Sequence, residues 1–121
     1  MQTEAKLNYS LPYKVYVALL TQSGTSAPTV TILENTIGTI NWTYGGVGTS
    51  IATASVSGAF TANKTWMHVQ NTNGGTYSGT AFAPSFGAPT TSLVLITFDT
   101  LTGNPQNGIL SSSSVEIRVY N

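Results

Sequence analysis

Apolar and polar residues alternate in short runs along most of the chain, which is the pattern of β-strands with one buried face. The runs are rich in β-branched and aromatic residues, and Gly, Pro, Asn and Ser cluster between them as turn signals. Runs that fit strands lie at residues 13–22, 29–34, 38–44, 49–58, 64–71, 75–83, 91–99 and 114–121. The pattern predicts an all-β fold, an antiparallel β-sandwich or jelly roll of about eight strands.

Residues 1–12 fall outside this pattern and are interpreted as an extended N-terminal arm, followed by a β-sandwich domain at residues 13–121. The arm carries Glu4 and Lys6 and ends at Pro12, which interrupts a strand or a helix. A frayed tail is the alternative. We expect the arm to dock on a neighbouring subunit.

The last strand range reads SVEIRVYN and alternates apolar residues with the charged Glu116 and Arg118. A terminal strand can close a sheet by pairing with a strand already in place, and the ladder then ties down the chain end. We therefore expect this strand to be integral to a sheet, with Glu116 and Arg118 pointing outward.

Two other ranges are apolar on both faces. Residues 91–99 contain LVLITF, as a central strand would. Residues 13–20 read YKVYVALL, with Tyr16, Ala18 and Leu20 on one face and further apolar residues on the other. The second range predicts that some apolar surface is buried outside the monomer core, as in a homo-oligomer, with a trimer favoured.

The composition is poor in charge. Charged residues make up 7% of the chain, with four Lys and Arg against four Asp and Glu, whereas an average soluble protein has about 25%. A chain with no net charge attracts neither nucleic acid nor an anionic membrane at long range, so we expect no nucleic-acid partner and no membrane insertion. Such a surface suits a subunit packed into an assembly, although an ordinary soluble domain that is poor in charge is the alternative.

Secretion and disulfide signals are missing from the sequence. The chain contains no cysteine. Its N-terminal residues include no apolar stretch of signal-peptide length, and its apolar runs are shorter than a membrane span. We expect a protein made in the cytoplasm and exported, if at all, by another route such as cell lysis.

Catalytic candidates are scarce. His68 is the only histidine, and the carboxylates are Glu4, Glu34, Asp99 and Glu116. A hydrolytic or metal site usually needs a second histidine or several carboxylates. We therefore predict a protein that is not an enzyme, with no catalytic residue, no cofactor and no metal.

Two segments superficially resemble ligand-binding loops. Residues 98–108 hold Asp99, Asn104 and Asn107, whose oxygens could bind Ca²⁺, but a plain loop is favoured because turns need the same residue types. Residues 45–50 read GGVGTS, lack the lysine of a phosphate-binding loop and precede a predicted strand. We expect a hairpin turn there.

Aromatic residues are the remaining functional signal. Trp66 shares the polar face of its predicted strand with Lys64 and His68, and Tyr44 and Tyr77 lie beside Gly-rich turns. Such rings can stack on sugars or form the centre of a subunit interface, and we favour the interface. The predicted interface or ligand-binding residues are Tyr13, Tyr16, Leu20, Tyr44, Trp66, His68 and Tyr77.

Several phrases of the chain, in order, resemble a family of small all-β virion-associated proteins of Bacteroidetes-type phages and prophages. They are PYKVYVALLTQSGTSAPT, ENTIGTINWTY, GAFTANKT, LITFDTLTGNPQNGIL and VEIRVYN. The resemblance extends over nearly the whole chain from Pro12 onward. It implies a structural protein of the virion, such as a capsid decoration, head-fibre, spike or tail subunit, that assembles with copies of itself and with other virion proteins.

A carbohydrate-binding or receptor-binding β-sandwich module, with a host surface glycan as its ligand, is the alternative function. It would use Trp66, Tyr44 and Tyr77 for stacking. The resemblance supplies no catalytic or binding residues to either interpretation.

Overall fold

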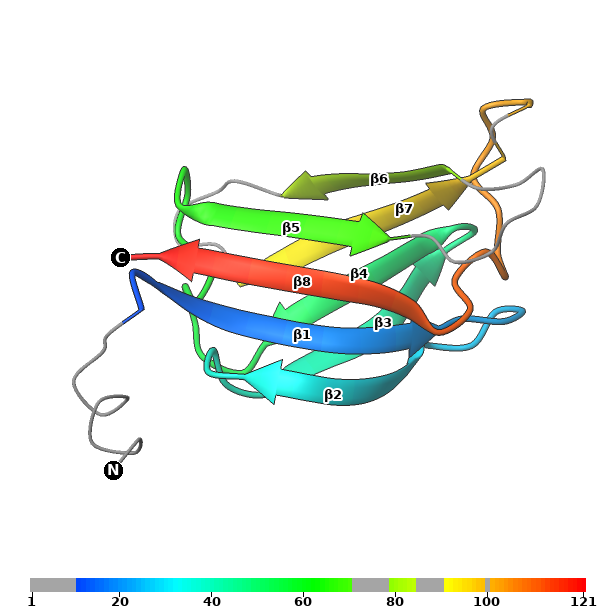
Figure 1. Cartoon of the computed structure of the whole chain (residues 1–121). Coiled ribbons are helices and arrows are strands. Elements are labelled where there is room, and N and C mark those ends of the chain that lie inside the picture. Colours follow the sequence, from blue (N-terminus) through cyan, green and yellow to red (C-terminus); the bar gives the residue numbers. More distant parts are fainter. Residues whose placement is uncertain (1–10, 71–78, 85–90, 100) are drawn as a thin grey trace.

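In the residues that the structure describes, the chain forms two antiparallel sheets of four strands each. The computed structural model describes residues 11–70, 79–84, 91–99 and 101–121, and in these ranges every strand pair is antiparallel and no helix occurs (Figure 1). None of the described residues forms a helix long and apolar enough to cross a membrane. The strands are β1 (Tyr13–Thr21), β2 (Thr29–Asn35), β3 (Ile40–Gly46), β4 (Thr49–Ala54), β5 (Thr65–Gln70), β6 (Gly79–Pro84), β7 (Ser92–Phe98) and β8 (Ser113–Tyr120).

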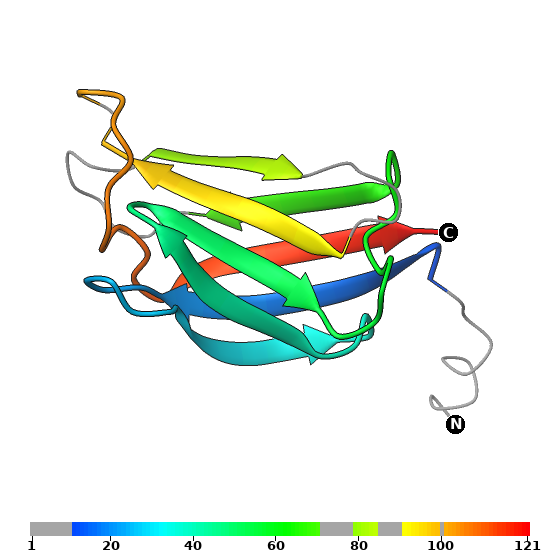
Figure 2. The ribbon, with the colours of Figure 1, turned by 180° about the vertical axis from the view of Figure 1, so that it is seen from behind.

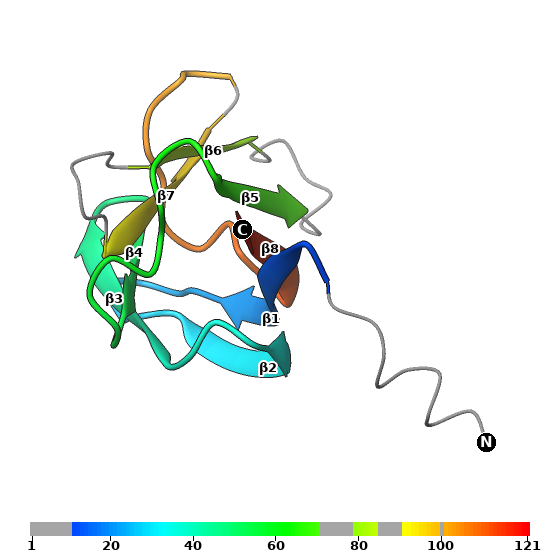
Figure 3. The same ribbon diagram turned by 90° about the vertical axis from the view of Figure 1, so that its left-hand side faces the viewer.

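The strand order sets which strands are central. Sheet A has the order β2-β1-β8-β5, and sheet B has the order β3-β4-β7-β6. Figure 1 shows sheet A in front, and Figure 2 shows sheet B from the other side. The end-on view in Figure 3 shows the two sheets as separate layers. The prediction of an all-β fold with antiparallel sheets is therefore confirmed.

The expected strand ranges differ from the observed ones where a turn intervenes. The range 49–58 stops early, at Ala54, because the amide of Ala59 donates a hydrogen bond to the carbonyl of Val56 and closes a turn. The range 38–44 begins late, at Ile40, because the side chain of Asn35 accepts hydrogen bonds from the next turn. The first residues of the range 75–83 lie outside the described residues.

The C-terminal strand lies inside sheet A, between β1 and β5. Tyr16 of β1 and Met67 of β5 both lie opposite Ile117, so β8 is hydrogen-bonded along both sides. The backbone amide of Asn121 also donates to the carbonyl of Pro12 at 2.9 Å. The prediction that the last strand is integral to a sheet is confirmed.

The alternation within β8 separates the core from the surface. Val115, Ile117 and Val119 are buried, whereas Glu116 and Arg118 point away from the core and are half-buried. A similar alternation in β1, β3, β4 and β7 places further side chains between the sheets. The buried cluster comprises Tyr16, Ala18, Leu20, Ile37, Ile40, Trp42, Ala52, Ala54, Phe60, Met67, Leu93, Leu95, Leu110, Val115, Ile117 and Val119.

A hydrogen bond connects the two sheets inside this core. The indole Nε1 of Trp42 on β3 donates to the hydroxyl of Tyr16 on β1 at 3.1 Å. Burial raises the pKa of the Tyr16 hydroxyl, and the hydrogen bond from Trp42 lowers it by a smaller amount. The bond satisfies two polar groups that would otherwise destabilise an apolar core.

The apolar pattern of β1 has a different cause from the one expected. Tyr16 and Leu20, which the sequence placed among the interface candidates, are fully buried in the core of the monomer. The opposite face of β1 is also covered within the chain, because Val15 is only 3% exposed. The two-sided apolar pattern of β1 is therefore that of a central strand whose outer face is partly covered. The prediction that Tyr16 and Leu20 lie in an interface or ligand-binding surface is wrong, because both belong to the core.

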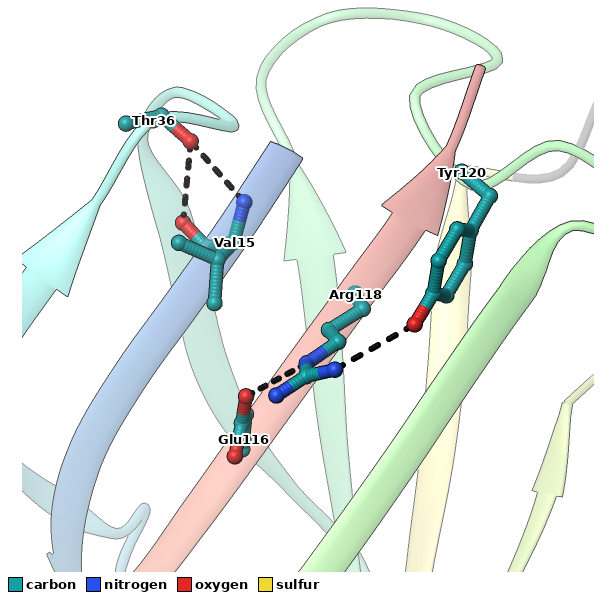
Figure 4. Close-up of polar contacts among 5 residues, drawn as sticks. All are labelled: Val15, Thr36, Glu116, Arg118 and Tyr120. Atoms are coloured by element: carbon teal, nitrogen blue, oxygen red, sulfur yellow. Dashed lines mark hydrogen bonds and ion pairs between the residues drawn. The ribbon is translucent and has the colours of Figure 1, made fainter. Parts of the chain in front are cut away.

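The start of β1 is held by a side chain from the segment that follows β2. Next to Val15, the hydroxyl of Thr36 accepts a hydrogen bond from the backbone amide at 2.8 Å and donates one to the carbonyl at 3.3 Å (Figure 4). The strand begins at Tyr13, directly after the expected arm. Residues 1–10 lie outside the described residues, so the arm and its docking stay predictions.

We predict that Tyr16→Phe lowers the free energy of unfolding by about 1–3 kcal/mol, because the buried indole of Trp42 loses its acceptor. Urea denaturation measures the change. Tyr13→Phe is the matched control, since it keeps the ring that lies against Tyr120 and Arg118, and it should stay within about 0.5 kcal/mol of the wild type. Equal losses in the two variants would contradict the role of the hydrogen bond between the sheets.

Candidate functional site

Three neighbouring strands of sheet A place aromatic and charged side chains together on its outer face. Arg118 lies opposite Val15 on one side and Trp66 on the other. The next outward position of β8 pairs Glu116 with His68, and the last pairs Tyr120 with Tyr13. We name this surface the aromatic face and define it as Tyr13, Trp66, His68, Glu116, Arg118 and Tyr120.

Arg118 is the central residue of the aromatic face. Its Nε donates to the carboxylate of Glu116 at 2.6 Å, and its Nη1 donates to the hydroxyl of Tyr120 at 3.2 Å (Figure 4). The guanidinium carbon lies 4.4 Å from the ring centre of Tyr13 and 5.2 Å from that of Trp66. The hydrogen bond to Tyr120, followed by that to Glu116, raises the pKa of Arg118, which therefore stays charged.

The rings around Arg118 also contact one another. Trp66 and His68 are stacked, with ring centres 6.0 Å apart and planes 13° from parallel. The rings of Tyr13 and Tyr120 are tilted, with centres 5.1 Å apart. Because these side chains already restrain each other, a partner that binds here would find them ordered, and binding would cost less conformational entropy.

The aromatic face combines exposed ring area with little net charge. Trp66 is 41% exposed and Tyr120 is 40% exposed. The charge of Arg118 is balanced by Glu116 in an ion pair whose two side chains are each 31% exposed, and a pair in contact with solvent contributes little to stability. The surface therefore fits a neutral partner, such as a protein interface or a sugar, better than a phosphate.

The remaining predicted site residues are not part of the aromatic face. Tyr44 lies on β3 of sheet B, where its hydroxyl accepts a hydrogen bond from the side chain of Asn107 at 3.1 Å. Tyr77 lies outside the described residues. Tyr16 and Leu20 belong to the core. Of the predicted set, the structure brings Tyr13, Trp66 and His68 together.

Sequence reasoning left Glu116, Arg118 and Tyr120 out of the site. Their outward positions in the last strand were visible in its alternation. Their neighbours were not, because the sequence does not show that β8 lies between β1 and β5. The contact between Arg118 and Trp66 depends on that strand order.

The turn between β3 and β4 is a hairpin, as expected from GGVGTS. Gly48 has a φ of 68°, and a Cβ atom there would come within 2.4 Å of the carbonyl oxygen of Thr97. The backbone amide of Gly48 donates to the side-chain oxygen of Asn107 at 2.7 Å. This turn therefore holds a structural contact with the segment 98–108.

Asp99, the carboxylate of the segment 98–108, is hydrogen-bonded within a turn of that segment. The carboxylate of Asp99 accepts a hydrogen bond from the amide of Leu101 at 2.8 Å, and its backbone carbonyl accepts one from Gly103 at 2.7 Å. In the part of the chain that the structure describes, no group of three or more His, Cys, Asp or Glu side chains could hold a metal ion. The hydrogen bonds of Asp99 are those of a turn, and the expectation of a plain loop without Ca²⁺ stays a prediction.

Comparison with known proteins identifies no relative: no family model, no curated protein and no solved structure matches this chain.

We predict that Asp99→Ala lowers the free energy of unfolding by about 1–3 kcal/mol, because the backbone amide of Leu101 loses the carboxylate that accepts its hydrogen bond and a hydrogen bond to a charged group contributes in this range. Asp99→Asn keeps a side-chain oxygen and should lose less. Denaturant titration with EDTA and with added Ca²⁺ should give the same values for each variant. A wild-type protein that EDTA destabilises and Ca²⁺ restores would show that the loop binds the ion.

Proposed function

We propose that the chain is a structural protein of a phage virion, that it acts by assembly and not by catalysis, and that it docks on neighbouring virion proteins through the aromatic face. The observation that carries this proposal is the position of Arg118 between the rings of Tyr13 and Trp66 on an accessible sheet face. Its place in the particle would be that of a capsid decoration, head-fibre, spike or tail subunit.

The residue types of the aromatic face support docking. Trp, Tyr and Arg are the side chains that most often dominate the binding energy of protein interfaces. Here they lie on one rigid sheet, and Arg118 is hydrogen-bonded to two neighbours. An interface of this kind would derive its affinity mainly from buried ring area, which salt does not screen.

The virion assignment is supported by the sequence resemblance and by the composition. A chain with 7% charged residues presents a largely neutral polar surface, which suits a subunit held among others. We also propose that the protein is located in the virion, that it is released by lysis and that it forms a homo-oligomer.

For the fold, we propose a β-sandwich in which all eight predicted ranges are strands. The buried cluster that draws on strands of both sheets supports this arrangement. The jelly-roll topology stays a prediction. In the described strands, β1 pairs with β2 and β3 pairs with β4, so these consecutive strands are neighbours within one sheet.

Carbohydrate binding is the second candidate function. The exposure of Trp66, at 41%, leaves ring surface available for a sugar, and the exposed Gln70 follows on the same face of β5. A glycan array probed with the wild type and with Trp66→Ala distinguishes the candidates. Saturable binding that Trp66→Ala abolishes would favour the sugar.

We predict that Trp66→Ala reduces incorporation of the chain into particles, because the interface loses its largest exposed ring. Particles would be grown with each variant supplied in trans, washed at low and high NaCl, and quantified by immunoblot. Leu101→Ala is the matched control, since Leu101 is 72% exposed in a loop away from the aromatic face.

The loss for Trp66→Ala should be about tenfold or more, which corresponds to a hot-spot residue, and the wild type should resist the high-salt wash. Equal incorporation of the two variants would contradict docking through the aromatic face. Particles that lack the wild-type chain altogether would contradict the virion role.

A further inference from the structure

The edge strand β2 forms a second exposed surface, separate from the aromatic face. It pairs with β1 along one side and ends the order of sheet A on the other. All seven of its residues are exposed, among them Val30 at 39%, Ile32 at 51% and Leu33 at 60%. An edge strand with apolar side chains favours pairing with another strand unless something blunts it.

The register shows which way these side chains point. Val30 lies opposite Leu20, and Ile32 lies opposite Ala18. Leu20 and Ala18 are core residues, so Val30 and Ile32 project from the core-facing side of sheet A. Figure 3 shows β2 at the margin of its layer. The high exposure of these two residues indicates that sheet B does not cover them there.

We propose that β2 pairs with β2 of a second copy of this chain, antiparallel and centred on Thr31. This register places Val30 opposite Ile32 of the partner subunit and Thr31 opposite Thr31 of the partner subunit. A strand that pairs with its own copy must match itself about a two-fold axis. The Thr31 register does so with β-branched residues at its three central positions, which are favourable cross-strand neighbours.

Charge and backbone geometry support this register. Glu34 is the only charged residue of β2, and the register places it beyond the paired positions, so that two Glu34 side chains do not meet. The irregularity in the β1–β2 ladder falls between Val17 and Ala18, after the regular segment that pairs residues 29–32. Pairing centred on Thr31 uses this regular segment.

The pairing joins the two copies of sheet A into one continuous sheet. The two-fold axis runs perpendicular to that sheet, so both aromatic faces lie on the same side. The dimer could then dock two aromatic faces on one supporting surface. The pairing itself does not depend on that docking, because it uses different residues.

Sedimentation equilibrium of the full chain at tens of micromolar tests the proposal. The wild type should have twice the 12.7 kDa chain mass, and Ile32→Lys should weaken association by about tenfold or more, because a charge enters the paired edge. Val47→Lys is the matched control, since Val47 is a 58% exposed apolar residue at the β3–β4 turn. A monomeric or trimeric wild type, or an Ile32→Lys variant that associates normally, overturns the proposal.

A misfolded Ile32→Lys variant would also fail to associate, so a cross-linking experiment tests the same register with a different substitution. The chain has no cysteine, so Thr31→Cys places one thiol at the proposed axis, opposite its own copy. Mild oxidation should give a covalent dimer with Thr31→Cys and not with Val47→Cys. Equal yields from the two variants overturn the proposed register.

Two further variants separate this interface from the other surfaces. Deletion of residues 1–10 and the substitution Trp66→Ala should both leave the dimer intact. Dissociation by the deletion would show that the arm is the occupant of the edge, and dissociation by Trp66→Ala would show that the aromatic face mediates self-association. Either result overturns pairing through β2 without contradicting docking in the virion.

Discussion

The hydrogen bonding of β8 to β1 and β5 is the constraint on which the rest of the structure depends. β1 belongs to the beginning of the chain and β8 to its end, and sheet A exists only when they meet. The alternation of side chains along β8 then has two consequences. Val115, Ile117 and Val119 enter the core, and the residues between them become the middle of the aromatic face. Core and surface are therefore set by the register of one strand.

Much of the architecture follows from the hydrophobic pattern. The alternation of SVEIRVYN predicted a strand within a sheet, and the two-sided apolar pattern of LVLITF predicted the central position of β7. The two-sided pattern of β1 was wrongly assigned to an interface, because a central strand with a covered outer face has the same pattern. Burial of Tyr16 and Leu20 depends on Trp42 and other residues from sheet B, which alternation within one strand does not reveal.

The aromatic face was predicted only in part for a related reason. Trp66 and His68 were recognisable as neighbours because they are two positions apart on one strand. The contact of Trp66 with Arg118 spans two strands that are far apart in the sequence, and Tyr13 joins from a third. Arg118 is balanced by Glu116, and the chain carries few other charges. The rings therefore remain the main accessible feature of the aromatic face. A neutral face on a rigid sheet and an apolar strand edge would both serve the proposed role in assembly.

The most direct test of the account is to remove β8 and add it back. A chain of residues 1–112 should lack the β-sheet signal in far-UV circular dichroism, because β1 and β5 lose their shared partner. A synthetic peptide of residues 113–121 should restore the signal, and the same peptide with Ile117→Asp should not, since position 117 is buried between the sheets. A truncated chain that shows the native spectrum and unfolds cooperatively without the peptide would contradict the central role of β8.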